Sequence, residues 1–337
     1  FRFAGMTGLL PIFLMNKVNQ ALPARTHRLK ASSRSIAKMA LCLTWGLTLV
    51  MIPACTQSPT ASNSSTPPPS GQAVLRISVL PTQNKAEQEK MIAPLDAHME
   101  KVLGQPVEFL IAESYKDNVD MLVDGRANAA YTGAVSYFEA LEQGAKVEPI
   151  AAPIDKFTNR PWYRACILVP ANSPIRTLAD LKSKRVAFVS PSSTSGYLMP
   201  LAALKQLDID PEQDFAQVLF GGTHAETEAL LEDRQVDAIA TNIPSYQKRQ
   251  ALGKLTPQNT RVLWESAPVP HSPFLISSDL PPDLIEKLKE AFLTVPPDLR
   301  DIVGTQAIGY TLVVASDYEP IQQLRIQLNL AAKGSSK

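Results

Sequence analysis

The chain has 337 residues, with 33 Lys and Arg against 32 Asp and Glu, so its formal net charge is +1. No run of basic residues is interleaved with aromatic ones, which argues against nucleic-acid binding. The 3 cysteines form no CxxC pair and are too few for a disulfide framework. We therefore expect no structural zinc, and no motif calls for a cofactor.

The first 55 residues resemble an export signal. Basic residues at 28–38 precede an apolar run at 39–52, which is the charge order of a secretory leader. The run ends in Ile52-Pro-Ala-Cys55, which resembles the bacterial lipobox, so we expect Cys55 to carry lipid and to become the mature N-terminus. An ordinary secretion signal or an uncleaved anchor are the alternatives.

Residues 56–72 are rich in Ser, Thr and Pro and carry almost no charge or apolar content, which predicts a flexible tether. A lipid anchor and a tether would hold the following domain at a membrane surface. Past the signal, no apolar stretch is long enough to span a bilayer. Residues 73–330 are enough for one large domain or two lobes, and 331–337 are expected to form a disordered tail.

Strand and helix patterns alternate along residues 73–330. The first series predicts strands at 74–80, 107–112 and 127–131, with helices at 85–103 and 119–123. The second predicts strands at 185–189, 217–220 and 236–241, with helices at 198–207 and 226–232, and further helices follow at 284–293 and 321–330. This alternation favours an α/β fold with parallel strands and crossover helices.

The two series also resemble each other. Residues 127–137 align without gaps with residues 236–246, with Ala, Thr, Ser and Tyr in register. Both pieces are typical of a strand that ends in a turn and a new helix. The pattern fits two α/β lobes that present strand ends and helix starts to a shared cleft.

Residues 190–200 contain the most informative motif, three consecutive hydroxyls followed by Gly196. They lie between a predicted strand and a predicted helix, where the first backbone N–H groups of the helix have no internal partner. A helix start also carries partial positive charge, so Ser193, Thr194 and Ser195 could cradle a tetrahedral oxyanion. An ordinary N-cap and turn is the alternative.

These residues resemble a known family. Residues 190–200, 221–224, 236–238 and 309–318 are similar to the phosphonate, phosphite and phosphate-binding proteins of ABC importers. The resemblance implies a type II periplasmic-binding-protein fold, with one lobe of residues 73–162 plus 273–330, a second of 163–272, and a two-strand hinge. It also implies a monomer that works in the periplasm and delivers a small phosphorus oxyanion to a membrane permease.

The resemblance implies roles for single residues. The hydroxyls of Ser193, Thr194 and Ser195 would bind the oxyanion, and His224 would donate to another oxygen. Tyr115 and Tyr163 match the family's tyrosine donors, although alone they would be read as packing residues, and His224 as a capping or surface histidine. Tyr131, Thr132 and Thr241 are expected at strand ends that face the cleft.

Two departures from the family pattern bear on the ligand. The helix that opens at residues 242–245 lacks the carboxylate that pairs with the amine of an aminoalkylphosphonate. The return hinge at 267–273 has His271 and Ser272 where relatives carry an Asp. We therefore expect phosphite, methylphosphonate or phosphate as ligand, and Ser272 and His271 as further contacts, His271 either as a donor or as a cover of the cleft mouth.

Two other function classes are weighed against a binding protein. A serine hydrolase could use Ser193 or Ser195 with His224, but the chain lacks a G-x-S-x-G elbow, a P-loop and metal-ligand spacing. A sensor domain that reports its ligand to a membrane signalling partner is the other alternative. The sequence favours a solute-binding protein without catalytic residues.

Overall fold

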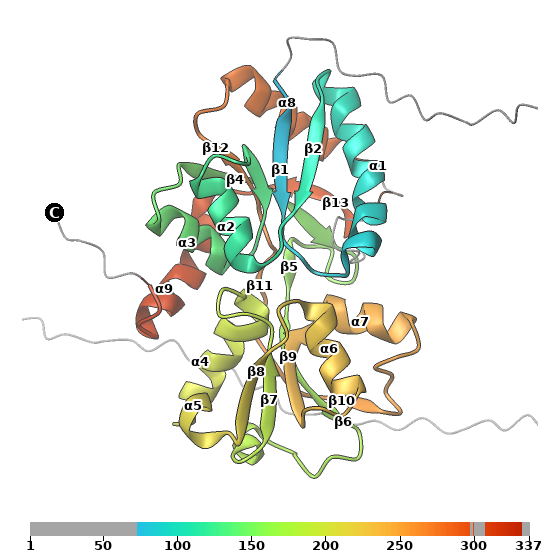
Figure 1. The fold of residues 1–337 in the computed structure, drawn as a ribbon, viewed down its shortest axis with the longest axis vertical. Helices are drawn as coiled ribbons and strands as arrows, with labels where there is room; N and C mark the ends of the chain where they lie inside the picture. Colours follow the sequence, from blue (N-terminus) through green and yellow to red (C-terminus); the bar gives the residue numbers. More distant parts are fainter. Residues whose placement is uncertain (1–72, 297–298, 300–306, 332–337) are drawn as a thin grey trace, which may run out of the picture. The chain divides into compact units, whose positions relative to one another are not determined.

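A computed structural model describes residues 73–296, 299 and 307–331, all of which belong to one structural unit. The predicted signal, the lipidation site and the tether lie outside the described residues, as does the tail from residue 332 onward. Within the described part of the chain, two mixed sheets form, each flanked by helices (Figure 1). We call the parts built on them lobe 1 and lobe 2.

Lobe 1 is built on a six-stranded sheet in the order β13-β4-β12-β3-β1-β2. Strand β1 pairs in parallel with β2 and β3, whereas β12 runs antiparallel to β3 and β4, and β13 antiparallel to β4. The strands are β1 (Leu75–Val79), β2 (Val107–Ile111), β3 (Ala129–Tyr131), β4 (Val147–Asp155), β12 (Phe274–Ser277) and β13 (Ala307–Leu312).

Both faces of this sheet are buried, because neighbouring residues of a strand point to opposite faces. In β12, Phe274 and Ile276 pack in one core with α1 and α8, while Leu275 packs in the other with α2, α3 and α9. The helices of lobe 1 are α1 (Lys85–Leu103), α2 (Tyr115–Val123), α3 (Ala134–Glu142), α8 (Pro282–Leu293), η3 (Ala315–Tyr318) and α9 (Glu319–Gln327).

Lobe 2 is built on a five-stranded sheet in the order β10-β6-β9-β7-β8. Its strands are β6 (Ala165–Pro170), β7 (Arg185–Phe188), β8 (Gln217–Phe220), β9 (Ala238–Asn242) and β10 (Thr260–Glu265). Its helical segments are η1 (Leu178–Leu181), η2 (Thr194–Leu198), α4 (Met199–Lys205), α5 (Pro211–Asp214), α6 (His224–Glu232) and α7 (Ile243–Ala251). Strand β7 pairs in parallel with β8 and β9, so the carboxyl ends of these strands meet at one edge.

Two short strands connect the lobes. Strand β5 (Trp162–Tyr163) pairs antiparallel with β11 (Val269–Pro270), and the chain passes from one lobe to the other through each of them (Figure 1). Two α/β lobes with a two-strand hinge confirm the architecture that the sequence predicted.

Most predicted elements are observed, with bounds that differ by a few residues. The helix predicted at 85–103 is observed as Lys85–Leu103, capped by Asn84 and ended by Gly104 with a positive φ of 67°. Helices α2 and α6 begin earlier than predicted, at Tyr115 and His224, because the side chains of Ser114 and Thr223 cap them.

Phe274 is central to the core of lobe 1. It is 1% exposed, and its ring lies 4.3 Å from that of Phe292 and 5.0 Å from that of Tyr131 between centroids. We expect Phe274→Ala to lower the free energy of unfolding by about 3–5 kcal/mol, because it leaves a cavity that rigid neighbours cannot fill. Phe157→Ala is the control, since Phe157 is 58% exposed. Denaturant unfolding measures both, and equal losses would contradict this assignment of the core.

Candidate ligand-binding site

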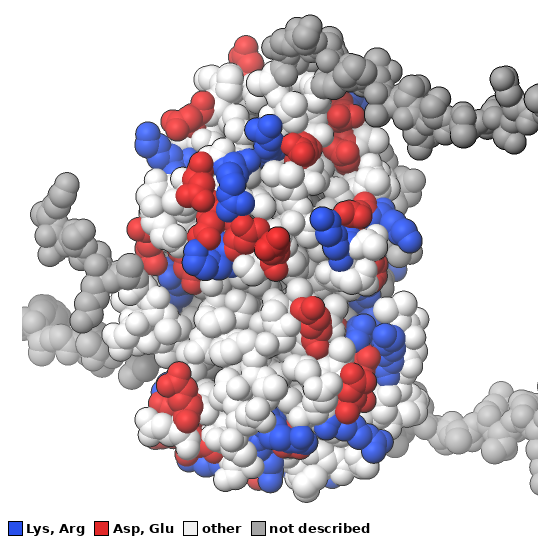
Figure 2. All heavy atoms as spheres, in the orientation of Figure 1, with Lys and Arg blue, Asp and Glu red and all other residues white. Residues whose placement is uncertain are grey.

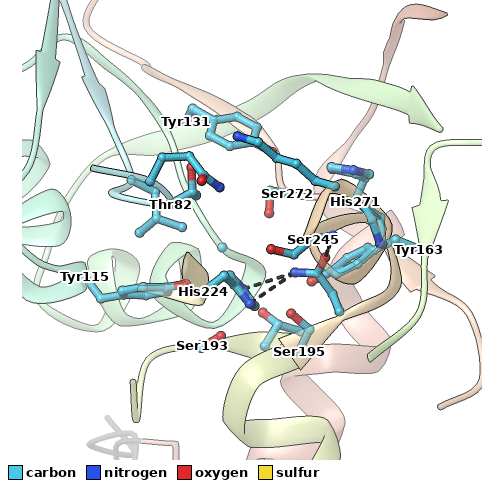
Figure 3. A pocket seen from close by; sticks show the side chains of 17 residues that line it. Thr82, Tyr115, Tyr131, Tyr163, Ser193, Ser195, His224, Ser245, His271 and Ser272 are labelled. Carbon is cyan, nitrogen blue, oxygen red and sulfur yellow. Dashed lines mark hydrogen bonds between the residues drawn. The ribbon is translucent and has the colours of Figure 1, made fainter. Parts of the chain in front are cut away.

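A cavity of about 50 Å³ lies between the two lobes. Figure 3 shows Ser193 and Ser195 on one side of it, and Thr82 and Tyr131 on the other. The predicted site residues that line it are Tyr115, Tyr131, Tyr163, Ser193, Thr194, Ser195, His224, His271 and Ser272. Residues far apart in the sequence and drawn from both lobes thus surround one small space.

Five helical segments of the described chain begin at this cavity. Its lining includes Tyr115 at the start of α2, Gly133 before α3, residues 193–195 at the start of η2, His224 at the start of α6, and Asn242, Pro244 and Ser245 at the start of α7. Each helix start has unpaired N–H groups and partial positive charge, worth roughly 0.3–1 kcal/mol for an anion nearby. The cavity is therefore suited to an anion.

The Ser-Thr-Ser motif forms a wide turn that the sequence did not predict. Residues Thr194–Leu198 adopt a π-helix, which continues directly into α4. Ser193 is its N-cap, and the side-chain Oγ accepts a bond of 3.0 Å from the backbone N of Gly196. One hydroxyl is thus used for capping, and the neighbouring residues Thr194 and Ser195 are left at the cavity wall.

Contacts cross the cleft beside the cavity. The Oγ1 of Thr194 in lobe 2 accepts a bond of 3.1 Å from the backbone N of Val135, in the first turn of α3 in lobe 1. Helix α3 starts at Gly133, which has no side chain to cap it. In addition, Lys248 Nζ of α7 lies 2.8 Å from Glu87 Oε1 of α1. The structure therefore holds the two lobes in contact around the cavity.

The cavity wall is almost free of formal charge. Among the described residues that line it there is no Asp or Glu, and Lys248 is the one cation, already paired with Glu87. Burial lowers the pKa of both His224 and His271 to about 4, so both rings are neutral near pH 7. Burial also raises the pKa of Tyr163 to about 12, although its bond to Ser195 lowers it. Burial raises the pKa of Tyr115 as well, and its bond to Ser193 acts in the opposite direction.

His224 is held by two neighbouring side chains. Its Nδ1 lies 2.9 Å from Thr241 Oγ1, and its Nε2 lies 3.1 Å from Asn242 Nδ2. His271 is held differently: its ring lies 5.0 Å from that of Tyr163 between centroids, and its Nδ1 is buried without a hydrogen-bond partner. His271 therefore lies inside the cavity wall at 4% exposure, and does not merely cover an open mouth.

Two predicted site residues do not line the cavity. Thr132 and Thr241 are buried, but they lie outside the lining, whereas their strand neighbours Tyr131 and Asn242 are part of it. Within β9 the reason is the alternation of side chains along a strand, because only one of two consecutive residues can point to the same side. Thr132 follows the last residue of β3 and is buried outside the lining. Thr241 instead contacts His224 from behind.

The sequence reasoning also missed part of the lining. These residues are Leu80, Thr82, Gln83, Gly133, Asn242, Pro244, Ser245 and Lys248. Asn242 and Ser245 carried a usable signal, because Asn242 caps α7 through a bond of 2.8 Å from the backbone N of Ser245. An Asn before a Pro-containing helix start at a strand end marks a position beside any ligand at that edge.

Neither a metal-ligand cluster nor a membrane-spanning helix is found among the described residues. The described part of the chain contains no cluster of three or more His, Cys, Asp or Glu that could hold a metal ion. Within it, no helix combines the length and the hydropathy needed to cross a bilayer. Figure 2 shows Lys and Arg mixed with Asp and Glu over both lobes, with a largely uncharged band between them.

Comparison with known proteins identifies the family. Residues 77–320 match the family model described as ABC transporter, phosphonate, periplasmic substrate-binding protein. The chain belongs to this family. Its members act in the periplasm as the binding component of an importer, which is the class that the sequence motifs predicted.

Curated relatives agree with this. The phosphate-import protein PhnD of Mycolicibacterium smegmatis is 28% identical over 270 residues, which cover 74% of this chain and 84% of the relative. The phosphonates-binding periplasmic protein of Escherichia coli is 24% identical over 277 residues, covering 79% and 80%. Both relatives are named as binding or import proteins.

Solved structures confirm the fold. A binding component of an ABC phosphonate transporter from Pseudomonas aeruginosa matches with a TM-score of 0.69 at 20% identity, over 79% of this chain and 91% of that one. PhnD1 of Prochlorococcus marinus, solved in complex with methylphosphonate, matches with a TM-score of 0.67 at 22% identity, over 76% and 98%. The two lobes and their hinge therefore form a type II periplasmic-binding-protein fold.

Gly196 is required by close packing. A Cβ at this position would lie 2.4 Å from Val189 Cγ2, far inside a normal contact. We expect Gly196→Ala to lower the free energy of unfolding by about 1–3 kcal/mol, because the π-turn or β7 must shift. Gly133→Ala is the control, since its nearest contact would be an ordinary 3.7 Å. Thermal and denaturant unfolding measure both, and an unchanged Gly196→Ala protein would contradict the close approach.

His271 should make the ligand-free protein sensitive to acid. Burial lowers its pKa to about 4. At a pH between this value and the ordinary histidine pKa of about 6.5, the unfolded chain binds a proton that the folded chain does not. Stability from this group is present at neutral pH and is lost as the pH falls. We expect the free energy of unfolding of His271→Gln, relative to the parent, to rise by about 2 kcal/mol between about pH 7 and pH 5. Buried carboxyls contribute equally to both proteins, so their effect cancels in the difference between the two free energies of unfolding. If this difference does not change with pH, the lowered pKa of His271 is refuted.

Proposed function

We propose that this protein is the solute-binding component of an ABC importer for a small phosphorus oxyanion, namely phosphite, methylphosphonate or phosphate. The lobes close over the anion, and the closed protein delivers it to the permease. The observation that carries this proposal is a cavity with many helix starts and hydroxyls but no carboxylate in its lining.

The size of the cavity supports a small ligand. The cavity volume of about 50 Å³ is small, which suits a tetrahedral ion with few substituents. A free amine would find no acidic partner in the lining, so an aminoalkylphosphonate is disfavoured. Relatives named for phosphate import and for phosphite binding support the same ligand class.

The contacts of the site support binding rather than catalysis. A serine nucleophile needs a base within hydrogen-bond reach. Here Ser193 bonds Gly196 and Tyr115, whereas His224 bonds Thr241 and Asn242. We therefore propose that the protein is not an enzyme, and we place the sensor function second, because the relatives are import proteins.

We also propose how the protein is arranged at the membrane. A signal in residues 1–55 ends at a lipidated Cys55, and residues 56–72 tether a monomer to the periplasmic face of the membrane. The lobes comprise residues 73–162 plus 273–330 and residues 163–272. Mass spectrometry of the N-terminal peptide tests the lipid, and an unmodified Cys55 would overturn that part.

Calorimetric titration of the purified full chain tests the ligand. The panel is phosphite, methylphosphonate, phosphate, 2-aminoethylphosphonate and sulfate. We expect a dissociation constant in the micromolar range or below for one of the first three, and at least roughly tenfold weaker binding of 2-aminoethylphosphonate. Absence of binding to every phosphorus anion would overturn the proposed function.

Ser193→Ala should weaken that binding. Ser193 lines the cavity, so the change removes a hydroxyl that can bond the charged anion, and we expect a loss of about 1–3 kcal/mol in binding free energy. Ser278→Ala, at an exposed turn of lobe 1, is the matched control and should bind as the parent does. If both variants bind equally well, Ser193 is not part of the cradle.

A further inference from the structure

Glu228 is a buried carboxylate directly behind the cavity, and the proposed function gives it no role. It is 1% exposed and does not line the cavity. Its Oε1 accepts a bond of 2.8 Å from Thr241 Oγ1, and the same Oγ1 lies 2.9 Å from His224 Nδ1. Glu228, Thr241 and His224 therefore form a continuous chain of bonds that ends at the cavity.

This chain places a proton on one nitrogen of His224. A threonine hydroxyl has a single hydrogen, and here it is donated to Glu228. Towards His224 the hydroxyl can then only accept, so Nδ1 must carry the hydrogen. A neutral imidazole has one N–H, which leaves Nε2 with a lone pair.

The Asn242 amide packs against the same ring. Asn242 Oδ1 accepts from the backbone N of Ser245 at 2.8 Å, which fixes the orientation of the amide. Its Nδ2 lies 3.1 Å from Nε2 and 3.4 Å from Nδ1. Because the two distances are nearly equal, the amide lies over the ring and not along the direction of either lone pair, so the Nε2 lone pair stays available to a ligand.

The chain holds in this form while Glu228 is ionised and the His224 ring is neutral. Burial raises the pKa of Glu228 to about 7 and lowers that of His224 to about 4. On α7, Arg249 Nε lies 3.6 Å from Glu228 Oε2, but Arg249 is bound more closely to Glu232, at 2.7 Å. Glu228 also faces the Ser245 hydroxyl and the Cys166 thiol. The titratable groups that line the cavity besides His224 are Tyr115, Tyr131, Tyr163, Lys248 and His271.

We propose that Glu228, acting through Thr241, is a positioning residue that keeps Nε2 of His224 a proton acceptor, so that the cavity binds its anion together with one proton. This inference rests on the proposed function. A phosphorus monoanion brings the proton as a P–OH that donates to Nε2. A dianion binds when a solvent proton is taken up on Nε2, and the resulting N–H then donates to the anion while Glu228 balances the imidazolium charge.

The proton requirement also determines which anions are selected. Phosphite, methylphosphonate and phosphate each hold a proton near neutral pH, whereas sulfate does not. For sulfate to bind, the ring, whose pKa burial lowers to about 4, has to take up a proton from solvent, or the Nε2 lone pair is left facing an anion oxygen. The same arrangement therefore favours phosphorus over sulfur oxyanions.

Calorimetry of the parent chain in buffers of different ionisation enthalpy counts the protons bound with the ligand. About one pH unit above the second pKa of phosphite, we expect close to one proton taken up per anion. About one unit below it we expect almost none, because the ligand brings its own. Proton release at the lower pH, with no uptake at the higher, would show that a bare dianion binds, and would overturn the inference.

Two variants test the chain of bonds itself. Thr241→Val keeps the shape but cannot accept from Nδ1, so proton uptake should fall and the preference for phosphite over sulfate should drop roughly tenfold. Thr227→Val is the matched control, because Thr227 is equally buried on α6 but donates to Thr223 O. Equal behaviour of the two variants would refute the role of Thr241 and Glu228.

Nitrogen NMR of His224 in the ligand-free parent separates this inference from the proposed function. We expect the Nδ1–H tautomer, and the Nε2–H tautomer would overturn the chain of bonds. If the Nδ1–H tautomer is found but no phosphorus anion binds, the proposed function fails, and the inference about proton-coupled binding fails with it. If an anion binds without proton uptake, the inference alone fails.

Discussion

The site depends on one constraint: its cavity has to compensate an anion with neutral groups. Of the described residues in the lining, Lys248 alone is charged, and Glu87 already pairs with it. Parallel strands resolve this, because each crossover starts its helix at the carboxyl edge of the sheet, where partial positive charge accumulates. Two such edges face each other here, so helix starts from both lobes surround the same space (Figures 1 and 3). Dipoles of this kind bind an anion and still allow its release.

The same atoms serve the cavity and the contact between lobes. Thr194 lines the cavity, and its Oγ1 accepts from the backbone of Val135 in the other lobe. A second contact joins Ala225 N of lobe 2 to Thr82 O of lobe 1 at 3.4 Å. Because residues that face the ligand also touch across the cleft, closure and binding share one set of interactions. An anion therefore stabilises the closed arrangement without any dedicated latch.

The sequence predicted those residues of the site that directly follow a strand or begin a helix. The position of His224 and of the three hydroxyls at 193–195 came from such local patterns, and the structure brings them together. Lining that depends on the approach of the lobes, as at Lys248, leaves no local pattern. Strand alternation, which turns Thr241 away from the side that Asn242 faces, can be predicted only when the exact register of the strand end is known. Gln88 shows the same limit, because it lies in a charged stretch of α1 but is fully buried and bonds Leu80 O and Thr82 N.

The placement of carboxylates connects the fold to ligand choice. A carboxylate in the lining could accept a P–OH or pair with an amine, but it would also repel a fully ionised anion. In this structure the buried carboxylate of Glu228, on α6, lies behind the cavity. Its chain of bonds reaches the cavity through Thr241 and His224. The negative charge is thereby withdrawn from the anion, while its influence on the proton of the ring is kept. A neutral ring nitrogen then does what a carboxylate would do, at lower electrostatic cost to the anion. Selection by proton count rather than by charge is the consequence of that placement.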